Sequence, residues 1–472
     1  MGFNRSEGQL YWLQVALVSL EVGFVRDMRR ISIFGLGRVG LVMATSFAKH
    51  GLKVIGIDPN PRVIEMLQKG VPPFYEPKLR EYLDHALKKR TLLVTQDSTL
   101  NSSSDLAYIA VSTPSRAEGG IDLSYVEKAA EMIGQSLRGA AKYQLVVIKS
   151  TVTPGTARNV VKATIQRESQ KTPEIDFSVC SNPEFLREGN AIYDTEFPDR
   201  IVIGSDDLAA MRRLERFYKK FHGPKIPPVI RTDFENAELT KYANNAFLAT
   251  KISFINCIAN IAELVPHADV KPIAAGIGLD KRIGHQFLDA GLGWGGSCFP
   301  KDLEALLSFS RGLGYGADLI RATVETNKKQ AEKAVQFAKH FLGSLGGKRI
   351  AVLGLAFKPE TDDMREAVSV PIINNFLNER ATVAVWDPEA MENARRIFGN
   401  RVEYATGSSD CLEQADCCIL ITEWPEFKKI RPEVYIKKMR QPFVIDGRRF
   451  LDLAIFRSAG VHVRAIGLGP ES

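Results

Sequence analysis

A glycine-rich turn between a short apolar strand and a helix constrains the fold of this chain more than any other feature. Residues 31–34 lead into Gly35-Leu36-Gly37-Arg38-Val39-Gly40, and a second predicted strand at 53–57 ends in Asp58. In such a turn the first glycine bends the chain tightly, the second lets a pyrophosphate reach the N–H groups of a helix N-terminus, and the third lets helix and strand pack closely. The order strand, turn, helix, strand predicts a doubly wound, Rossmann-like unit that binds a dinucleotide.

The acid after the second strand predicts which dinucleotide binds. Asp58 stands 21 residues after Gly37, where a carboxylate accepts hydrogen bonds from ribose hydroxyls and repels a 2′-phosphate. We therefore expect NAD, although Arg62 nearby leaves NADP open as an alternative. The predicted cofactor-binding residues of this unit are Gly35, Gly37, Val39, Gly40, Asp58 and Arg62.

Two further predicted strands, at 106–111 and 145–148, each end in a polar turn. Ligands of an open parallel sheet lie at the carboxyl ends of its strands. We therefore expect Ser112, Thr113 and Thr151, which stand in these turns, beside the cofactor. Capping of the helices that follow is the competing explanation for each of them.

Composition sets the scale and excludes several classes of function. At 472 residues the chain needs two or three hydrophobic cores. Its formal charge is +7, but Lys and Arg are dispersed among acidic residues, so neither nucleic acid nor a membrane surface is an expected partner. The six cysteines show no C-x-x-C pair and no His/Cys ligand spacing, which predicts no metal site, no disulfide framework and a cytoplasmic location. Cys257, Cys417 and Cys418 are predicted to be packing residues.

A second α/β pattern, without the glycine fingerprint, follows a helical middle. A long helix is predicted from Asn236 to about residue 264, and Lys241 and Asn245 lie on one face of it because they are four residues apart. Strands at 349–354, 381–386, 418–421 and 443–446 form the second unit. The predicted domains are an N-terminal extension (1–28) with an alternative start at Met28, a dinucleotide-binding domain (29–230), a central helical domain (231–330) and a second Rossmann-like domain (331–472).

One cysteine has neighbours that suit catalysis. Cys298 stands in Gly293-Trp294-Gly295-Gly296-Ser297-Cys298-Phe299-Pro300-Lys301-Asp302, with small residues before it and an ammonium close by. Small residues let a substrate carbon approach, and a nearby cation favours the nucleophilic thiolate. Together with a nicotinamide site, this arrangement indicates covalent oxidation of an aldehyde.

Seven segments in order resemble the nucleotide-sugar dehydrogenases of the UDP-glucose/GDP-mannose dehydrogenase family, and most closely the branch that acts on UDP-glucose. These segments are 35–40, 181–189, 237–250, 282–284, the Cys298 loop, 357–366 and 446–449. The resemblance implies two Rossmann-like domains joined by a long central helix, a helical dimerisation domain and a homodimer formed through that helix. It also implies twofold oxidation of the sugar C6 alcohol by NAD, from UDP-glucose to UDP-glucuronate.

The resemblance implies a role for each matching catalytic residue. Cys298 would form a thiohemiacetal and then a thioester, which water hydrolyses; Lys241 and Asn245 would stabilise the oxyanion. Asp302 would orient Lys241 or a water, Thr151 would hold that water, and Glu184 would be the general acid/base.

Binding residues carry over in the same way. Glu188, Lys301 and Arg365 would lie near the nicotinamide or the diphosphate. The UDP-sugar would be held by Glu184, Phe185, Leu186, Lys241, Asn245, Arg282, Gly295, Phe357, Lys358 and Arg448, with Arg282 supplied by the partner subunit in some family members. Asp289 departs from relatives that have a lysine near the substrate phosphates.

Three alternatives stay open on the sequence. A sister dehydrogenase would act on GDP-mannose or a UDP-N-acetyl sugar, although the 246–250 stretch resembles the UDP-glucose branch. A single-step hydroxy-acid or hydroxyacyl dehydrogenase would need neither Cys298 nor the second unit. A non-enzymatic nucleotide-sugar sensor would be free to lose the catalytic set that this chain retains.

Overall fold

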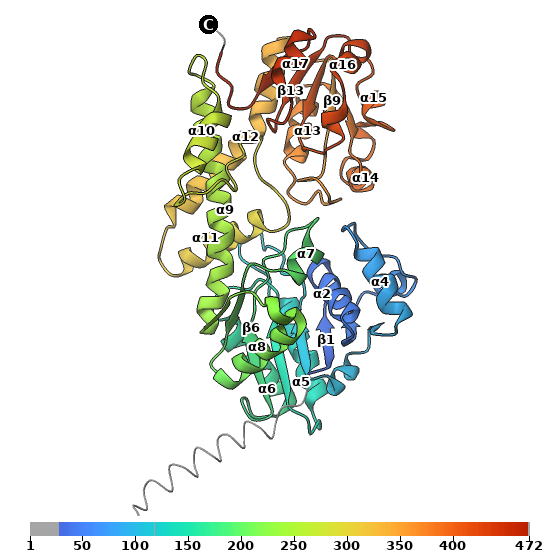
Figure 1. Cartoon of the computed structure of the whole chain (residues 1–472), viewed down its shortest axis with the longest axis vertical. Helices are drawn as coiled ribbons and strands as arrows, with labels where there is room; N and C mark the ends of the chain where they lie inside the picture. Colours follow the sequence, from blue (N-terminus) through green and yellow to red (C-terminus); the bar gives the residue numbers. More distant parts are fainter. Residues whose placement is uncertain (1–27, 118, 471–472) are drawn as a thin grey trace, which may run out of the picture.

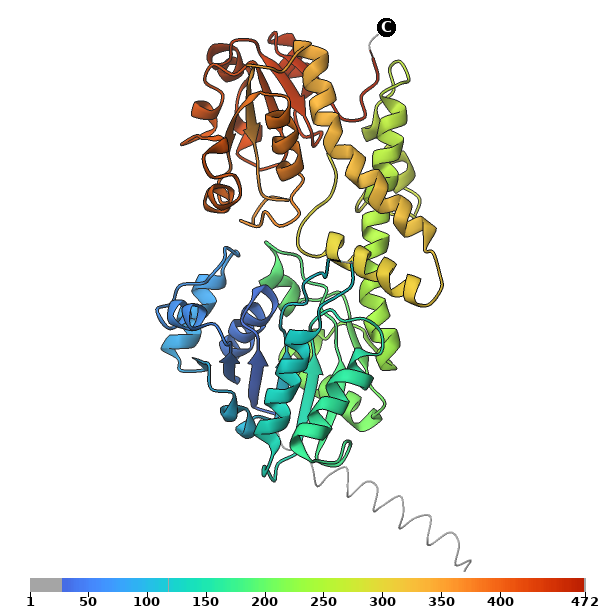
Figure 2. The ribbon, with the colours of Figure 1, turned by 180° about the vertical axis from the view of Figure 1, so that it is seen from behind.

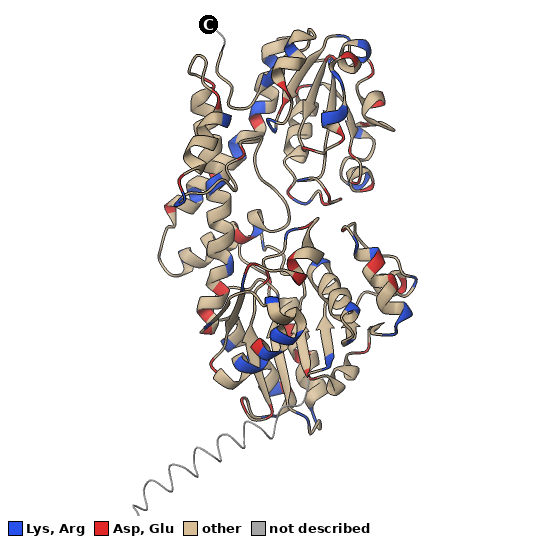
Figure 3. Cartoon of the chain, in the orientation of Figure 1, with Lys and Arg blue, Asp and Glu red and all other residues tan. Residues whose placement is uncertain are grey.

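The computed structural model describes residues 28–117 and 119–470, so the predicted extension, apart from Met28, lies outside the described residues. Two α/β lobes lie along the long axis of the molecule, and long helices run along one side of both (Figure 1). Within the described ranges, no helix is long and apolar enough to cross a membrane. Lys and Arg are interspersed with Asp and Glu over both lobes (Figure 3).

The first lobe is built on an eight-stranded sheet of order β3-β2-β1-β4-β5-β6-β7-β8. All neighbouring strands are parallel except β6 and β7. Successive side chains of β4 point to opposite faces of the sheet: Tyr108 packs in the core on one face and Ile109 in the core on the other. Its strands are β1 (Arg30–Phe34), β2 (Lys53–Ile57), β3 (Leu92–Thr95), β4 (Leu106–Ile109), β5 (Gln144–Ile148), β6 (Phe177–Ser181), β7 (Ile201–Gly204) and β8 (Val229–Thr232). Its helices are α2 (Arg38–Lys49), α3 (Pro61–Gln68), α4 (Leu79–Lys88), α5 (Ser124–Leu137), α6 (Ala163–Ser169), α7 (Ala191–Glu196) and α8 (Leu208–His222).

The second lobe repeats the strand order of the first. Its six parallel strands are arranged β11-β10-β9-β12-β13-β14, which matches β3-β2-β1-β4-β5-β6. Its strands are β9 (Arg349–Leu353), β10 (Thr382–Trp386), β11 (Glu403–Tyr404), β12 (Cys417–Leu420), β13 (Phe443–Asp446) and β14 (His462–Ala465). Its helices are α13 (Ser369–Asn378), α14 (Met391–Phe398), α15 (Ser408–Cys411), α16 (Pro432–Lys438) and α17 (Leu453–Ser458).

Helices connect the two lobes. They are α9 (Phe234–Ala262), α10 (Val270–Gly278), α11 (Phe299–Gly312) and α12 (Asp318–Leu342), and α12 packs along α9 (Figure 2). The predicted fold class, two doubly wound Rossmann-like units with a long central helix, is confirmed. The predicted domain boundaries stay predictions.

The two sheets share the same turn after their first strand. Gly35 and Gly354 have φ of +93° and +95°, a region that favours glycine. In each lobe a carboxylate that follows the second strand accepts a hydrogen bond from the backbone N–H of the residue after this glycine. Asp58 accepts from Leu36 at 2.9 Å, and Asp387 accepts from Leu355 at 2.7 Å. Each carboxylate therefore fixes the turn, and in the first lobe helix α2 begins directly after it.

Of the three cysteines predicted to be packing residues, two are buried and one is exposed. Cys417 and Cys418 are buried in β12, as expected for packing residues. The prediction for Cys257 is wrong, because this residue is exposed on the outer side of α9. The amphipathic pattern of α9 is weak since the helix is apolar on several sides, so the sequence did not reveal which side faces outward.

Candidate active site

A cavity of about 550 Å³ lies between the first sheet and the helices α9 and α11. It is lined by four of the predicted catalytic residues: Glu184, Lys241, Asn245 and Cys298. Glu184 follows β6, Lys241 and Asn245 stand on successive turns of α9, and Cys298 directly precedes α11. Segments separated by more than 100 residues in the sequence thus supply one site.

A buried ion pair forms one wall of this cavity. Lys241 Nζ lies 2.8 Å from Glu184 Oε1, and both side chains are less than 10 % exposed. Burial opposes both charges, but Glu184 more than offsets it and raises the pKa of Lys241. Burial likewise opposes the charge of Glu184, yet Lys241 and the Leu186 N–H lower the pKa of this carboxyl. The pair is therefore an ammonium facing a carboxylate.

A second polar chain starts from the next turn of α9. Asn245 Nδ2 donates to Asp302 Oδ2 at 2.7 Å, and Lys301 Nζ donates to Asp302 Oδ1 at 2.5 Å. Lys301 also reaches Thr113 Oγ1 at 3.5 Å, at the end of β4. Asp302, expected to orient Lys241 or a water, thus contacts Asn245 and Lys301, whereas Lys241 is paired with Glu184.

The Cys298 thiol is held close to this charged cluster. Burial raises the pKa of Cys298 to about 11, and Glu184 and Asp302 add to this, while Lys241 and the Ser297 hydroxyl act in the opposite direction. The cation that favours the thiolate is Lys241, whereas Lys301, the ammonium near Cys298 in the sequence, is paired with Asp302. The effect of Lys241 does not prevail over burial. The resting thiol therefore keeps its proton at neutral pH, so that it needs a base before it can act as a nucleophile.

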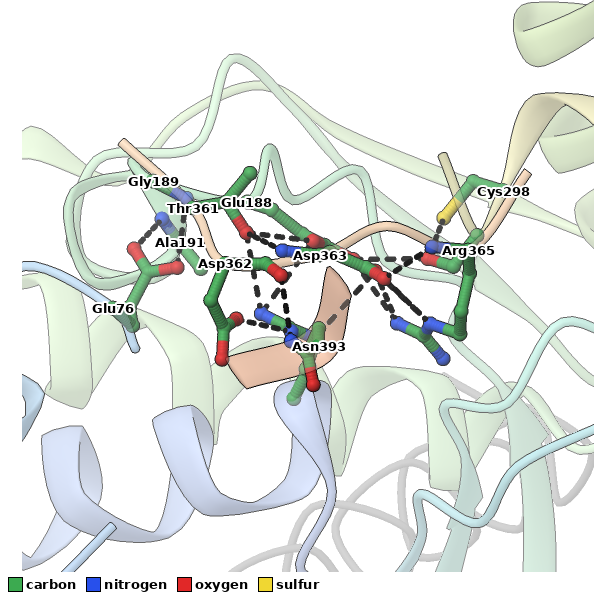
Figure 4. A network of polar contacts seen from close by, with 12 residues as sticks. Glu76, Glu188, Gly189, Ala191, Cys298, Thr361, Asp362, Asp363, Arg365 and Asn393 are labelled. Atoms are coloured by element: carbon green, nitrogen blue, oxygen red, sulfur yellow. Dashed lines mark hydrogen bonds and ion pairs between the residues drawn. The ribbon is translucent and has the colours of Figure 1, made fainter. Parts of the chain in front are cut away.

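Glu188 connects the Cys298 loop to both lobes (Figure 4). Its carboxylate accepts the Ser297 hydroxyl at 2.9 Å and lies 3.5 Å from guanidinium nitrogens of Arg38 and Arg365. Burial raises the pKa of Glu188 against the opposing effect of Arg38. Ser297 Oγ in turn lies 3.6 Å from Cys298 Sγ.

A loop of the second lobe completes this network (Figure 4). Arg365 makes a bidentate contact with Asp363, which is buried, and Arg38 donates to Asp362 at 2.7 Å. Asn393 Nδ2 donates to the backbone oxygen of Asp362 at 2.7 Å. The loop at 361–365 is thereby attached to the helix that begins at the dinucleotide turn.

The remaining predicted substrate residues of the second lobe lie against the Cys298 loop. Arg448 donates to the backbone oxygen of Gly293 at 2.8 Å. A Cβ at Gly295 would lie 2.1 Å from the Glu366 oxygen, so only glycine permits this contact. Phe357 packs on Gly296, and burial lowers the pKa of Lys358 despite nearby Glu188.

Several predicted residues lie away from the cavity. Arg282 is 89 % exposed and binds only Asp280 among the described side chains. Arg62, Ser112 and Asp289 are exposed, and Thr151 follows β5 without lining the cavity. Phe185 and Leu186 do line the cavity, and the Phe185 ring lies 5.5 Å from Lys241 Nζ.

Sequence reasoning missed two residues near the site. Lys149, in the polar turn after β5, lines the cavity and donates to Asn182 at 3.0 Å. Its position at a strand end was a usable signal. Glu238 accepts the N–H groups of Gly155 and Ala157 at 2.6 and 2.8 Å, which ties the turn after β5 to α9. No sequence pattern indicated this contact, because it joins segments 81 residues apart.

The turn at Gly35 fits a dinucleotide. Helix α2 begins after Gly37, no side chain caps it, and a Cβ at Gly37 would meet open space. A Cβ at Gly40 would lie 1.9 Å from the Gly35 oxygen, so helix and turn are in contact. Uncapped N–H groups beside open space suit a pyrophosphate.

Family models match nearly the whole described chain. The NAD-binding, central and UDP-binding domains of the UDP-glucose/GDP-mannose dehydrogenase family match residues 29–222, 235–329 and 351–453. The chain belongs to the UDP-glucose/GDP-mannose dehydrogenase family. As a member it is an NAD-dependent oxidoreductase, and its cofactor is NAD.

Individual relatives of this dehydrogenase cover almost its full length. The UDP-glucose 6-dehydrogenase TuaD of Bacillus subtilis is 44 % identical over 93 % of both chains. The UDP-glucose 6-dehydrogenase AglM of Haloferax volcanii is 40 % identical over 89 % of this chain and 97 % of its own. A UDP-glucose dehydrogenase structure from Pyrobaculum islandicum has a TM-score of 0.85 at 39 % identity, covering 93 % of this chain and 98 % of its own. A UDP-D-ManNAc dehydrogenase structure from Pyrococcus horikoshii has a TM-score of 0.81 at 28 % identity, covering 93 % and 99 %.

Proposed function

We propose that this dehydrogenase oxidises the C6 alcohol of UDP-glucose to the carboxylate of UDP-glucuronate through a covalent adduct on Cys298. The observation that carries the proposal is one cavity lined by Cys298, Lys241, Asn245 and Glu184. The relatives named UDP-glucose 6-dehydrogenase, at up to 44 % identity, support the choice of substrate. Overall, one UDP-glucose, two NAD and one water would give one UDP-glucuronate, two NADH and three protons.

NAD would be held at the N-terminus of α2. The N–H groups after Gly37 would bind its pyrophosphate, and Asp58 its ribose hydroxyls. When bound, NAD supplies the hydride acceptor for the alcohol and then for the thiohemiacetal. Thr113 and Lys301, which contact one another at the end of β4, would border the nicotinamide.

Lys241 and Asn245 would stabilise negative charge on the C6 oxygen as the alcohol proton passes to water and from there to solvent. Each would donate a hydrogen bond to that oxygen, and one such donor is typically worth about 3 kcal/mol of the barrier. Cys298 Sγ would then add to the aldehyde carbon, and its proton would pass to Glu184, a carboxylate that lines the same cavity. A base is needed because burial keeps the thiol protonated at rest.

Hydrolysis of the thioester would complete the reaction. Water would add to the thioester carbon, the C–S bond would break, and the sulfur would regain a proton to restore the thiol. Glu184, after releasing the thiol proton to solvent, would take the proton from the attacking water and return it to the sulfur, and Thr151, in the turn after β5, would help to hold that water.

The UDP moiety would bind between the lobes. Phe357, Lys358 and Arg448 lie where the second lobe meets the Cys298 loop, and the matching UDP-binding domain spans residues 351–453. Arg282 would enter the site of the partner subunit, which agrees with its exposure on its own chain.

We also propose a homodimer formed through α9. Phe247, Phe254 and Ile261 are more than half exposed and stand seven residues apart, so that they form one apolar stripe. Leu264 continues this stripe at 82 % exposure. A twofold axis would place the same stripe of a second copy of α9 against this one, so that both apolar surfaces are buried.

We also propose a cytoplasmic location, with which the six free thiols agree.

The ratio of NADH formed to UDP-glucose consumed tests the proposal. A ratio near two, with UDP-glucuronate as product, is expected; a ratio near one would contradict twofold oxidation. A competition among UDP-glucose, UDP-N-acetylglucosamine, UDP-N-acetylmannosamine and GDP-mannose tests the substrate. UDP-glucose should give the highest kcat/KM, and any other ranking would reassign the enzyme within its family.

A further inference from the structure

Lys149 is a cation of the cavity that the proposed mechanism does not use. It follows β5 and lines the same cavity as Cys298 and Lys241. Its ammonium donates to Asn182 Oδ1 at 3.0 Å, and among the described residues it forms no ion pair with a carboxylate: Glu184 acts on it only through its charge. An ammonium has three N–H donors, so two of them are free to face the cavity or its water.

The other cations of the cavity wall each have a carboxylate partner. These pairs are Lys241 with Glu184 at 2.8 Å, Arg187 with Asp194 at 2.6 Å and Arg200 with Asp199 at 4.0 Å. Burial lowers the pKa of His222, the remaining titratable nitrogen group of the wall, so this residue is neutral at pH 7. Burial lowers the pKa of Lys149 to about 8, with Glu184 opposing this shift and Lys241 adding to it, so Lys149 is charged at pH 7 and gives the wall one positive charge in excess.

The proposed reaction creates the opposite charge in the same place. A neutral CH₂OH group enters the cavity, and a carboxylate with one negative charge is present after hydrolysis and loss of the acid proton. Lys241 is already engaged by Glu184. A buried carboxylate without a cation is costly, because charges interact strongly where water is excluded.

We propose that Lys149 is the charge-balancing residue of the active site, and that it stabilises the C6 carboxylate of the product over the alcohol of the substrate. This inference rests on the proposed function. Lys149 would act through its charge from the Glu184 side of the cavity, since Glu184 is the carboxylate that raises the pKa of its ammonium. Asn182 would hold the ammonium in position, and its oxygen is itself fixed by the Tyr218 hydroxyl at 2.5 Å.

Calorimetric binding of UDP-glucose and UDP-glucuronate to Lys149→Gln tests this role without turnover. Glutamine keeps a donor for Asn182 and removes the charge. The affinity for UDP-glucuronate should fall about tenfold relative to that for UDP-glucose, and Lys149→Arg should restore the ratio. Lys171→Met is the matched control, because Lys171 is a partly buried lysine outside the cavity that donates to the oxygen of Ala140.

An equal loss of affinity for both ligands in Lys149→Gln would overturn the proposal, since it would indicate a structural role. If that variant does not fold, the unaltered chain provides a second measurement. UDP-glucuronate should bind about tenfold more tightly than its C6 amide, which has the same shape and no charge; equal affinities would overturn the proposal. If Lys149 does not have this role, the ratio of NADH formed to UDP-glucose consumed should still be near two. If the proposed function itself is wrong, that ratio should differ from two.

Discussion

The guanidinium of Arg38 lies 2.7 Å from the carboxylate of Asp362, so that the first residue of α2 is tied to a loop of the second lobe. Both side chains are about one-fifth exposed. Arg38 also lies within 4.0 Å of Glu188 and Asp363. The helix that begins at the dinucleotide turn is thereby in direct contact with the lobe expected to hold UDP.

A double-mutant cycle on this pair should reveal coupling between the lobes. Arg38→Met and Asp362→Asn should each lower the apparent free energy of unfolding, and the interaction energy should be about 1 kcal/mol. Urea titrations followed by circular dichroism measure all four proteins. Additive effects would contradict direct coupling, and the exposed pair Lys69 and Glu65 is a control for which a smaller interaction energy is expected.

Two glycines of the dinucleotide turn should respond differently to alanine. Gly40→Ala should destabilise the chain by about 2 kcal/mol, because its Cβ would lie 1.9 Å from the Gly35 oxygen. Gly37→Ala should fold normally, since its Cβ meets open space, but should bind NAD more weakly. Thermal unfolding and NAD titration by tryptophan fluorescence separate the two effects. Tight NAD binding by Gly37→Ala would argue against a pyrophosphate at that position.

Removal of the thiol should uncouple the two oxidations. Cys298→Ser should lower UDP-glucuronate formation by at least about 10³-fold and leave NAD binding intact, with a trace of aldehyde as the residual product. Chromatography of the reaction mixture measures both products. Cys257→Ser, which alters an exposed cysteine outside the cavity, is the control and should keep full activity. Undiminished uronate production by Cys298→Ser would refute covalent catalysis.

Alkylation of Cys298 should depend steeply on pH. Burial raises the pKa of its thiol to about 11, so the rate with iodoacetamide should rise about tenfold per pH unit between pH 8 and 10. Lys241→Met should slow the reaction further, because Lys241 favours the thiolate. Peptide mass spectrometry distinguishes Cys298 from the exposed Cys257. A plateau already reached at pH 8 would show that the thiol is ionised near neutrality.

A charge on the α9 stripe should dissociate the dimer. Phe254→Glu should sediment as a monomer at micromolar concentration, because burial of a carboxylate at an apolar contact is unfavourable. Tyr125→Glu, at a similarly exposed aromatic residue on α5, is the control and should leave the sedimentation coefficient unchanged. A wild-type chain that sediments as a monomer would exclude a stable dimer.

Sequence reasoning was most successful where the chemistry is local. The turn at Gly35 and the acid Asp58 lie within one strand, helix, strand unit, so their spacing alone predicts how they meet. Lys241 and Asn245 share a helix face for the same reason. The fold class followed from repeating this pattern near residue 350.

Contacts between distant segments could not be predicted in the same way. The pairing of Lys241 with Glu184, and of Asp302 with Asn245, depends on how α9, α11 and the loop after β6 pack together. The pKa of Cys298 depends on burial, which a list of charged neighbours does not reveal. Arg38 and Asp362 are 324 residues apart, and no local pattern connects them.

The carboxylate of Asp387 is fully engaged inside the second lobe and offers no acceptor for the ribose of a dinucleotide. Its two oxygens accept from the backbone N–H groups of Leu355, Ala356, Glu389 and Ala390, and from the Trp424 indole. Asp58 accepts only two backbone N–H groups among the described residues and is partly exposed. Grafting G-x-G-x-x-G after β9 would therefore supply the missing glycines without an acceptor free for a ribose. The two lobes have the same architecture, but only one of them retains an acid that a cofactor can reach.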